Sequence, residues 1–251
     1  MSILLTEFDP APAIIEPASL IAPMDGFPRV AVGPFSGDLF HSIQQMPGVR
    51  QLTQIGCANG KTPVLSVPYQ GVEIAVFLAP VGASCCVGAL EELHALGAQS
   101  FLTFGSCGVL NRSIQDGGLI LPTSAFRDEG TSYHYLPPGD YLTIPTSARL
   151  AEIFTSMGVP FRQTRVWTTD SFYRETRKNR EMRKREGCSA VDMECASVMA
   201  VGLFRKIPVY QFLYTADCLD GSRWDPRILG KWPDELRQAV LRIALETAIR
   251  L

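Results

Sequence analysis

The stretch LTFGSCGVL, residues 102–110, joins a buried β-strand to a cluster of small residues. Its apolar first half predicts a strand inside a sheet. The change to Gly105, Ser106, Cys107 and Gly108 predicts a sharp turn of the chain around a ligand. Because such turns present backbone amides to anionic or polar groups, the residues after this strand are the first candidates for a functional site.

Working outward from this strand, β-type segments alternate with helical ones. Strands separated by helices run largely parallel in one sheet that is covered on both faces. We therefore predict a single-domain three-layer α/β/α sandwich with a central mixed, largely parallel twisted sheet. Predicted strands cover residues 29–32, 63–67, 72–78, 100–104, 119–122, 165–168 and 208–214, and predicted helices cover 84–96, 147–157, 175–186, 193–205 and 234–249.

Local signals define the ends of these elements. Ser84 and Ser147 are predicted to cap the first turns of two helices, and Gly97 and Gly158 to end them. The stretch PYQGVE predicts a hairpin at one edge of the sheet. Residues 1–28, rich in Pro and Ala, are predicted to form an N-terminal arm, and residues 29–251 the catalytic domain.

The composition is that of an ordinary globular protein, with 46% hydrophobic residues, 19% charged residues and a formal net charge of -2. Neither nucleic acid nor a membrane is an expected partner. The uncharged run 74–90 is shorter than the ~20 apolar residues of a membrane-spanning helix. Seven cysteines without disulfide or zinc spacing, and an N-terminus without a signal-peptide pattern, predict a cytoplasmic protein with reduced thiols and no metal.

Two motifs resemble known catalytic loops only in part. GCANGKT, residues 56–62, has three residues between its glycines instead of the four of a phosphate-binding P-loop, and a β pattern follows it, so we interpret it as a polar turn. Cys107 could act as a nucleophile with His134 as its base, but a lone cysteine and a distant histidine are weak evidence.

Three carboxylates lie at the ends of apolar segments. Asp192 and Glu194 begin the helix in VDMECASVMAVGLF, and the helix N-terminus alone accounts for Asp192. Glu194 stands beside a buried run and is expected to accept hydrogen bonds from a ligand such as a sugar. Asp217 ends the apolar strand in FLYTADCLD, as a candidate general acid or base or as a turn cap.

Two aromatic residues, Phe172 and Tyr173, precede a very basic helix in TTDSFYRETRKNREMRKREG. Most of the Arg and Lys residues in this run are expected to form a solvated helix face. Arg174 and Arg177 lie nearest the aromatic pair and are the two candidates for a role in a site.

Taken in order, AVGPFSGD, FGSCGVL, DGGLILPTSAFRDEGTSYHYLP, TTDSFY, VDMECAS and YTAD resemble the nucleoside phosphorylase/nucleosidase family. This family includes uridine phosphorylase and the hexameric bacterial purine nucleoside phosphorylases. The resemblance runs from Arg29 to Asp217. It implies a phosphorylase-type fold and a pentosyltransferase that cleaves the N-glycosidic bond of a nucleoside.

The resemblance also implies roles for individual residues. Asp217 would be the general acid that protonates a departing purine, and Glu194 would position the ribose and thereby take part in catalysis. Phosphate would be the co-substrate, without any cofactor. The implied phosphate or anion site is Gly33, Gly105 and Ser106; the ribose site is Met193 and Glu194; and the base site is Cys107, Gly108, Phe172 and Asp217.

The chain departs from the family pattern at three places. Gly37 and Thr103 stand where the phosphorylases carry phosphate-binding arginines, and Ala216 stands where a serine often precedes the catalytic aspartate. Without arginine, the phosphate loses bidentate charge-assisted hydrogen bonds. Possible substitute cations are Lys61, Arg127, Arg174 and Arg177.

Several alternatives remain open at the level of sequence. Phosphorolysis to free base and (deoxy)ribose 1-phosphate is favoured, with a nucleosidase that uses water, or a catalytically altered nucleoside-binding protein, as alternatives. Asp217 favours purines, whereas the DSFY segment is as similar to the uridine enzymes. The resemblance further implies a homo-oligomer, a dimer or hexamer, because family members complete each site with residues from a neighbouring subunit.

Overall fold

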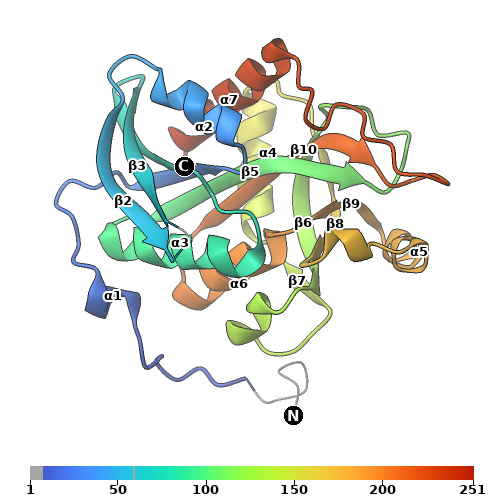
Figure 1. The fold of residues 1–251 in the computed structure, drawn as a ribbon, viewed down its shortest axis with the longest axis horizontal. Coiled ribbons are helices and arrows are strands. Elements are labelled where there is room, and N and C mark those ends of the chain that lie inside the picture. Colours follow the sequence, from blue (N-terminus) through green and yellow to red (C-terminus); the bar gives the residue numbers. More distant parts are fainter. Residues whose placement is uncertain (1–7, 59) are drawn as a thin grey trace.

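The computed structural model of the chain describes residues 8–58 and 60–251. Helices and strands alternate through most of this length (Figure 1). The helices are α1 (Pro17–Leu20), α2 (Gly37–Gln44), α3 (Ala83–Leu96), α4 (Thr146–Ser156), α5 (Arg177–Arg185), α6 (Cys195–Arg205) and α7 (Asp234–Ala248), with 3-10 turns η1 (Thr131–His134) and η2 (Phe172–Arg174). The strands are β1 (Val30–Pro34), β2 (Arg50–Cys57), β3 (Gly60–Tyr69), β4 (Val72–Phe77), β5 (Ser100–Val109), β6 (Leu119–Asp128), β7 (Tyr141–Thr143), β8 (Arg162–Thr169), β9 (Cys188–Asp192) and β10 (Val209–Cys218).

The strands form one mixed sheet in the order β10-β6-β8-β9-β5-β1-β4-β3-β2, and β7 pairs with β6. Strands β4, β1, β5 and β10 pair in parallel, whereas β6 is antiparallel to β10 and β9 is antiparallel to β5. Since β5 pairs with β10 as well as with β9, the strands β5, β10, β6, β8 and β9 close into a ring. The ring brings the carboxyl ends of β5, β9 and β10 together.

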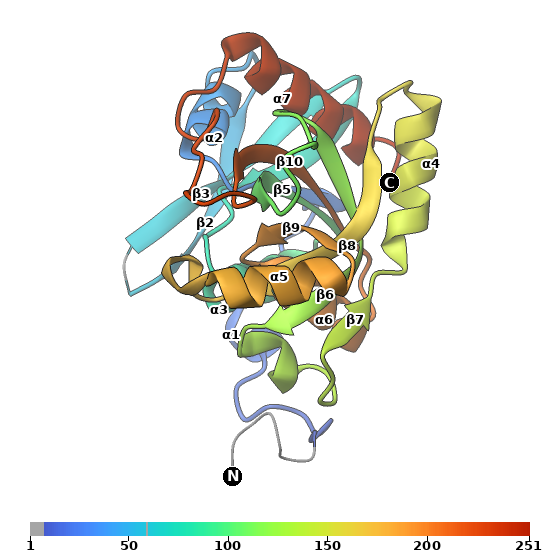
Figure 2. The ribbon, with the colours of Figure 1, turned by 90° about the vertical axis from the view of Figure 1, so that its right-hand side faces the viewer.

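Helices cover both faces of the sheet, as the sequence predicts. Helices α3 and α6 pack on one face, and α2, α4 and α7 lie on the other (Figures 1 and 2). Each face carries its own apolar core. Stacked rings of Phe104 and Phe212, with Phe154 against the second, anchor the core under α4 and α7.

Each predicted strand and helix overlaps an observed element, and the β3–β4 hairpin is where PYQGVE predicts it. The sequence missed strands β2, β7 and β9 and helices α1 and α2. Each omission has a physical reason: β2 is an edge strand of mostly polar residues, β7 and β9 have three and five residues, and α1 and α2 have four and eight. Short or half-polar elements carry too little periodicity to be recognised.

The two glycine ends are confirmed and the two serine caps are wrong. Gly97 and Gly158 have φ of +132° and +66°, a region that favours glycine. Helix α3 follows Gly82 and α4 follows Pro145, and neither N-cap position contributes a side-chain hydrogen bond. Ser147 is buried inside the first turn of α4, and its hydroxyl accepts a hydrogen bond from the Gln163 side chain.

The described part of the N-terminal arm, residues 8–28, packs on the α3 and α6 face. Arg205 of α6 pairs with Glu16 at 2.9 Å, and the Met24 amide donates to the Leu96 carbonyl at 2.9 Å. Residues 1–7 lie outside the described residues. Within residues 8–58 and 60–251, no helix has the length and apolar character that crossing a membrane requires.

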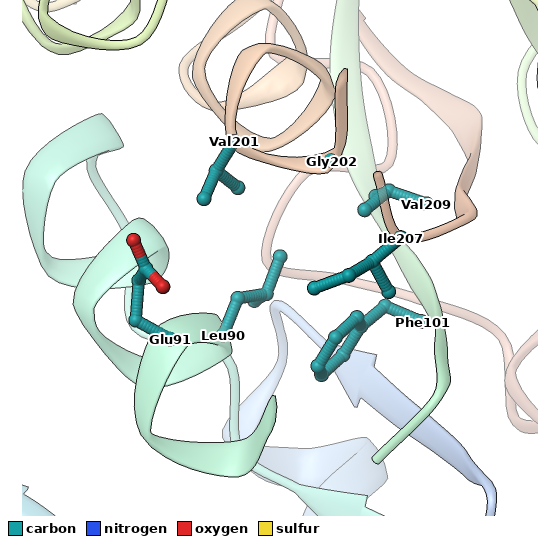
Figure 3. A pocket seen from close by; sticks show the side chains of 7 residues that line it. All are labelled: Leu90, Glu91, Phe101, Val201, Gly202, Ile207 and Val209. Carbon is teal, nitrogen blue, oxygen red and sulfur yellow. The ribbon is translucent and has the colours of Figure 1, made fainter. Parts of the chain in front are cut away.

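Helix α6 packs closely on the sheet at Gly202, which lines a small space with Leu90, Phe101, Ile207 and Val209 (Figure 3). A Cβ at Gly202 would lie 2.7 Å from Val209 Cγ2 and 2.9 Å from the Ile207 carbonyl oxygen. We expect Gly202→Ala to lower the free energy of unfolding by ~1–3 kcal/mol, because a backbone atom cannot move aside.

Gly88→Ala is the matched control in α3. A Cβ there meets nothing within 4 Å, so alanine is expected to stabilise the protein by ~0.5–1 kcal/mol. Urea unfolding of both variants measures the difference. Equal effects at the two glycines would contradict the close approach of α6.

Candidate active site

The ends of three strands meet at Gly108. This residue pairs with Asp217 of β10 on one side and with Val191 of β9 on the other. A Cβ at Gly108 would lie 2.5 Å from Leu219 Cδ1 and 3.3 Å from Asp217 Oδ1. Glycine is therefore required by the close approach of its neighbours.

The prediction of a sharp turn at Gly105–Gly108 is wrong, since β5 continues to Val109 and pairs with β10 over this length with one register shift after Cys107. At Gly105 as well, glycine allows a close contact: a Cβ would lie 2.8 Å from Phe35 Cβ. The segment is a strand whose glycines make room for neighbouring side chains.

A β-bulge orients Asp217. The register of β10 on β5 shifts between Thr215 and Asp217, so Ala216 is the extra residue and Asp217 lies opposite Gly108. Burial raises the pKa of Asp217, although the Trp224 hydrogen bond and the charge of Arg227 act in the opposite direction. A carboxyl with a raised pKa keeps its proton to higher pH, as a general acid requires.

Trp224 is a site residue that the sequence reasoning missed. Its Nε1–H donates to Asp217 Oδ2 at 2.7 Å, which leaves Oδ1 on the side of Gly108. This bond orients the Asp217 carboxyl group, which Ala216 cannot do because it has no hydroxyl group. In the sequence, the only indication of this role is a tryptophan seven residues after Asp217. The loop conformation that brings its indole to the carboxyl group cannot be predicted from the sequence.

Glu194 joins the first turns of two helices. It is the N-cap residue of α6, it is 6% exposed, and its Oε1 accepts from the Gly82 amide, 2.7 Å away at the start of α3. Burial, and then the charge of Asp192, raises the pKa of Glu194. Neighbouring Met193 is half-buried beside it.

Both carboxylate oxygens of Asp192 accept hydrogen bonds from within the protein. Its Oδ1 accepts from the Thr168 hydroxyl at 2.7 Å, and its Oδ2 accepts from the amides of Cys195 and Glu194 at 2.7 and 3.1 Å. The Thr168 hydroxyl in turn accepts from the Ala196 amide at 3.0 Å. These bonds fasten the end of β8 to the start of α6 and so hold Glu194 in place.

Cys107 is buried, and burial followed by the charges of Asp192 and Asp217 raises its thiol pKa well above the ordinary value. A thiol without thiolate character is a poor nucleophile. His134, the other half of the suggested pair, is exposed in η1. The site therefore favours the carboxylates over a covalent thiol mechanism.

Phe172 and Tyr173 form an exposed aromatic pair in η2, with ring centroids 4.1 Å apart. Phe172 is 51% exposed, which is unusual for a phenylalanine and leaves a ring face free to pack on a planar ligand.

The expected anion site holds uncharged polar groups. Thr103 pairs with Gly33 on one side and Gln211 on the other. The Thr103 hydroxyl and both polar atoms of the Gln211 side chain are buried and have no hydrogen-bond partner within the described residues. Ser106 is half-buried farther along β5, and Gly37 is exposed in the first turn of α2.

None of the four candidate cations makes a hydrogen bond or ion pair to this region within residues 8–58 and 60–251. Arg127 donates to the Ser132 hydroxyl and to the carbonyls of Pro137 and Leu136, so its guanidinium holds its own loop together. Lys61 and Arg174 are exposed, and Arg177 donates to the Ser222 carbonyl at 2.6 Å. No group of three or more potential metal ligands occurs in the described chain.

Comparison with known proteins gives a family match. The model of the Phosphorylase superfamily matches residues 29–251. A purine nucleoside phosphorylase of DeoD type from Jannaschia sp. (strain CCS1) is 25% identical over 245 residues, covering 87% of this chain and 98% of that protein. The structure of purine nucleoside phosphorylase from Toxoplasma gondii in complex with immucillin-H matches with a TM-score of 0.73 at 19% identity, covering 95% of this chain and 96% of that one, and confirms the predicted α/β fold.

Two further relatives match over shorter segments. A guanosine phosphorylase from Halorubrum lacusprofundi is 25% identical over 152 residues, or 59% of this chain, and a uridine phosphorylase from Thermococcus kodakarensis is 36% identical over 108 residues, or 42% of it. The matched segments span 63% and 39% of these two relatives, less than two thirds of either.

We expect the hydrogen bonds between Thr168, Asp192 and Ala196 to stabilise the folded protein. Thr168→Val removes one donor from a buried carboxylate and one acceptor from the Ala196 amide, so we expect a loss of ~1–3 kcal/mol in the free energy of unfolding. Thr53→Val is the control, since this strand hydroxyl makes no hydrogen bond among the described residues. Urea unfolding measures the free energy of unfolding of both variants. Equal decreases for Thr168→Val and Thr53→Val would show that the Thr168 hydrogen bonds do not hold the site together.

Proposed function

The chain belongs to the phosphorylase superfamily, and we propose that it cleaves the N-glycosidic bond of a purine nucleoside by phosphorolysis. The products would be the free base and (deoxy)ribose 1-phosphate. One observation carries the proposal: the ends of β5, β9 and β10 meet at Gly108, where a carboxyl with a raised pKa lies beside a strand that leads to a buried glutamate. A homo-oligomer and a cytoplasmic location remain predictions of the sequence.

Asp217 assists the departure of the base. As the bond between base and sugar breaks, its electron pair moves onto the base, and the proton on Asp217 Oδ1 passes to a ring nitrogen. The raised pKa of Asp217 favours the protonated form, and Trp224 holds the other oxygen so that Oδ1 remains directed at the base. Phe172 would pack on the face of the base.

Glu194 binds and positions the sugar. The Gly82 amide fixes its carboxylate through Oε1, and Oε2 is left to accept from ribose hydroxyls. Asp192 and Thr168 support this arrangement by fixing the first turn of α6.

The nucleophile would be phosphate held by Gly33, Gly105 and Ser106. Relatives named guanosine phosphorylase and purine nucleoside phosphorylase support this choice. One observation favours water as a second candidate: the groups at Thr103 and Gln211 are uncharged, and Arg127 is occupied in its own loop. A neutral nucleophile needs no arginine.

Phosphate dependence separates the two candidates. We expect base release from a panel of purine and pyrimidine nucleosides to rise with added inorganic phosphate, and (deoxy)ribose 1-phosphate to appear in equal amount, because phosphate is consumed in each turnover. Chromatography of both products measures this. Free ribose formed at a rate independent of phosphate would identify a nucleosidase, and binding without turnover in calorimetry would identify a nucleoside-binding protein.

Loss of the acid tests the role of Asp217. Asp217→Asn keeps the shape and can still accept from Trp224, but it cannot donate a carboxylic proton, so we expect kcat on purine nucleosides to fall by ~10²–10⁴-fold. Asp234→Asn, at the exposed start of α7, is the control and should leave kcat unchanged. A rate for Asp217→Asn within about threefold of wild type would exclude general-acid catalysis by this residue.

A further inference from the structure

We propose that Thr103 and Gln211 form a buried binding site for ordered water between β5 and β10. The site takes a small uncharged molecule that both donates and accepts hydrogen bonds, and it does not take phosphate. This inference goes beyond the proposed function and does not depend on nucleoside cleavage.

The two side chains lie next to each other in the sheet. Thr103 and Gln211 are directly opposite in the parallel pairing of β5 with β10, and the register of this pairing is unbroken from Val209 to Thr215. Because opposite residues of a regular pairing project from the same face of a sheet, both side chains enter the same layer. They are 0% and 2% exposed, so neither reaches solvent.

The layer around them is apolar. Residues two positions away on the same strands share their face, and these include Phe101, Val209 and Leu213 of the core under α3 and α6. Within the described residues, the Thr103 hydroxyl and both polar atoms of the Gln211 amide have no hydrogen-bond partner. Unpaired polar atoms in an apolar core are costly, and nearly all buried polar groups in proteins are hydrogen-bonded. A ligand that pairs with these three atoms removes that cost.

The three atoms select the chemistry of the ligand. Nε2 of Gln211 only donates, Oε1 only accepts, and the Thr103 hydroxyl does either. Water has donors and acceptors for all three, and a buried water typically makes about three hydrogen bonds. A phosphate dianion has only acceptors, so Oε1 would face it unpaired, and burying its charge among neutral groups is costly. The site therefore favours water.

The site is separate from the candidate active site. Thr103 precedes Gly108 by five residues and Gln211 precedes Asp217 by six. At the rise of a β-strand, about 16–20 Å of chain separates the two places. Water held here is therefore too far from the base to attack the sugar. Its role is to join the side chains of β5 and β10 and so to stabilise the pairing that positions Asp217.

Thermal unfolding of three variants gives the first test. Thr103→Val removes one partner of the water and leaves Gln211 in place, so we expect the melting temperature to fall by about 2–4 °C. Gln211→Leu should have a similar effect. The double variant removes every polar atom of the site, so its decrease should be smaller than the sum of the two single decreases.

The sign of the single changes decides the outcome. If the three atoms were unpaired in the folded protein, Thr103→Val and Gln211→Leu would each raise the melting temperature, and this result would overturn the proposal. Thr53→Val is the matched control, a half-buried threonine on β2 whose hydroxyl makes no hydrogen bond in the described part of the chain, and it should change the melting temperature little.

A crystal structure of the wild type identifies the ligand without relying on any variant. We expect an ordered water within hydrogen-bond distance of the Thr103 hydroxyl and of the Gln211 amide. A direct hydrogen bond between the two side chains, with no water at either, would contradict the proposal.

Inorganic phosphate separates this site from an anion site. We expect added phosphate to shift the melting temperatures of the wild type and of Thr103→Val by the same amount, because phosphate does not bind at Thr103. A phosphate effect that is present in the wild type and in Thr53→Val but lost in Thr103→Val would overturn the proposal. A wild type that cleaves no nucleoside would refute the proposed function and would leave these three measurements as they are.

Discussion

The close approach of three strand ends at Gly108 is the constraint on which the site depends. Any side chain there would overlap Leu219 and crowd Asp217 and Val191. The approach is possible because β5 pairs with β10 and β9 at once and closes the strands into a ring. One glycine therefore allows the ends of strands that are distant in the sequence to lie next to one another.

The three carboxyl groups differ in how many hydrogen-bond donors they have, and this difference separates their roles. Asp192 has three donors and no free direction, so its role is to fix the first turn of α6. Glu194 has the Gly82 amide and an oxygen to spare, and Asp217 has the indole of Trp224 and an oxygen to spare. Buried acids with one donor each can exchange partners with a substrate, whereas a fully satisfied acid cannot.

Much of this arrangement is visible in the sequence. Glu194 directly precedes the apolar run of α6 and Asp217 lies at the end of the apolar run of β10, and periodicity identified each long element. The bulge at Ala216, the indole bond and the Gly82 amide were not predictable, because each depends on the path of a loop or on pairing between distant strands. The turn expected at Gly105–Gly108 failed for the same reason: small residues there permit close contacts across the sheet, and composition alone does not distinguish that use from a turn.

We propose that a purine nucleoside lies between Phe172, Glu194 and Asp217. A crystal structure of Asp217→Asn with a bound purine nucleoside tests it most directly. We expect a ring nitrogen of the base within hydrogen-bond distance of residue 217, the base packed against Phe172, and the ribose hydroxyls hydrogen-bonded to Glu194. A nucleoside bound instead at the opposite ends of the strands, in the groove lined by Arg29, Gln99 and Leu251, would contradict it.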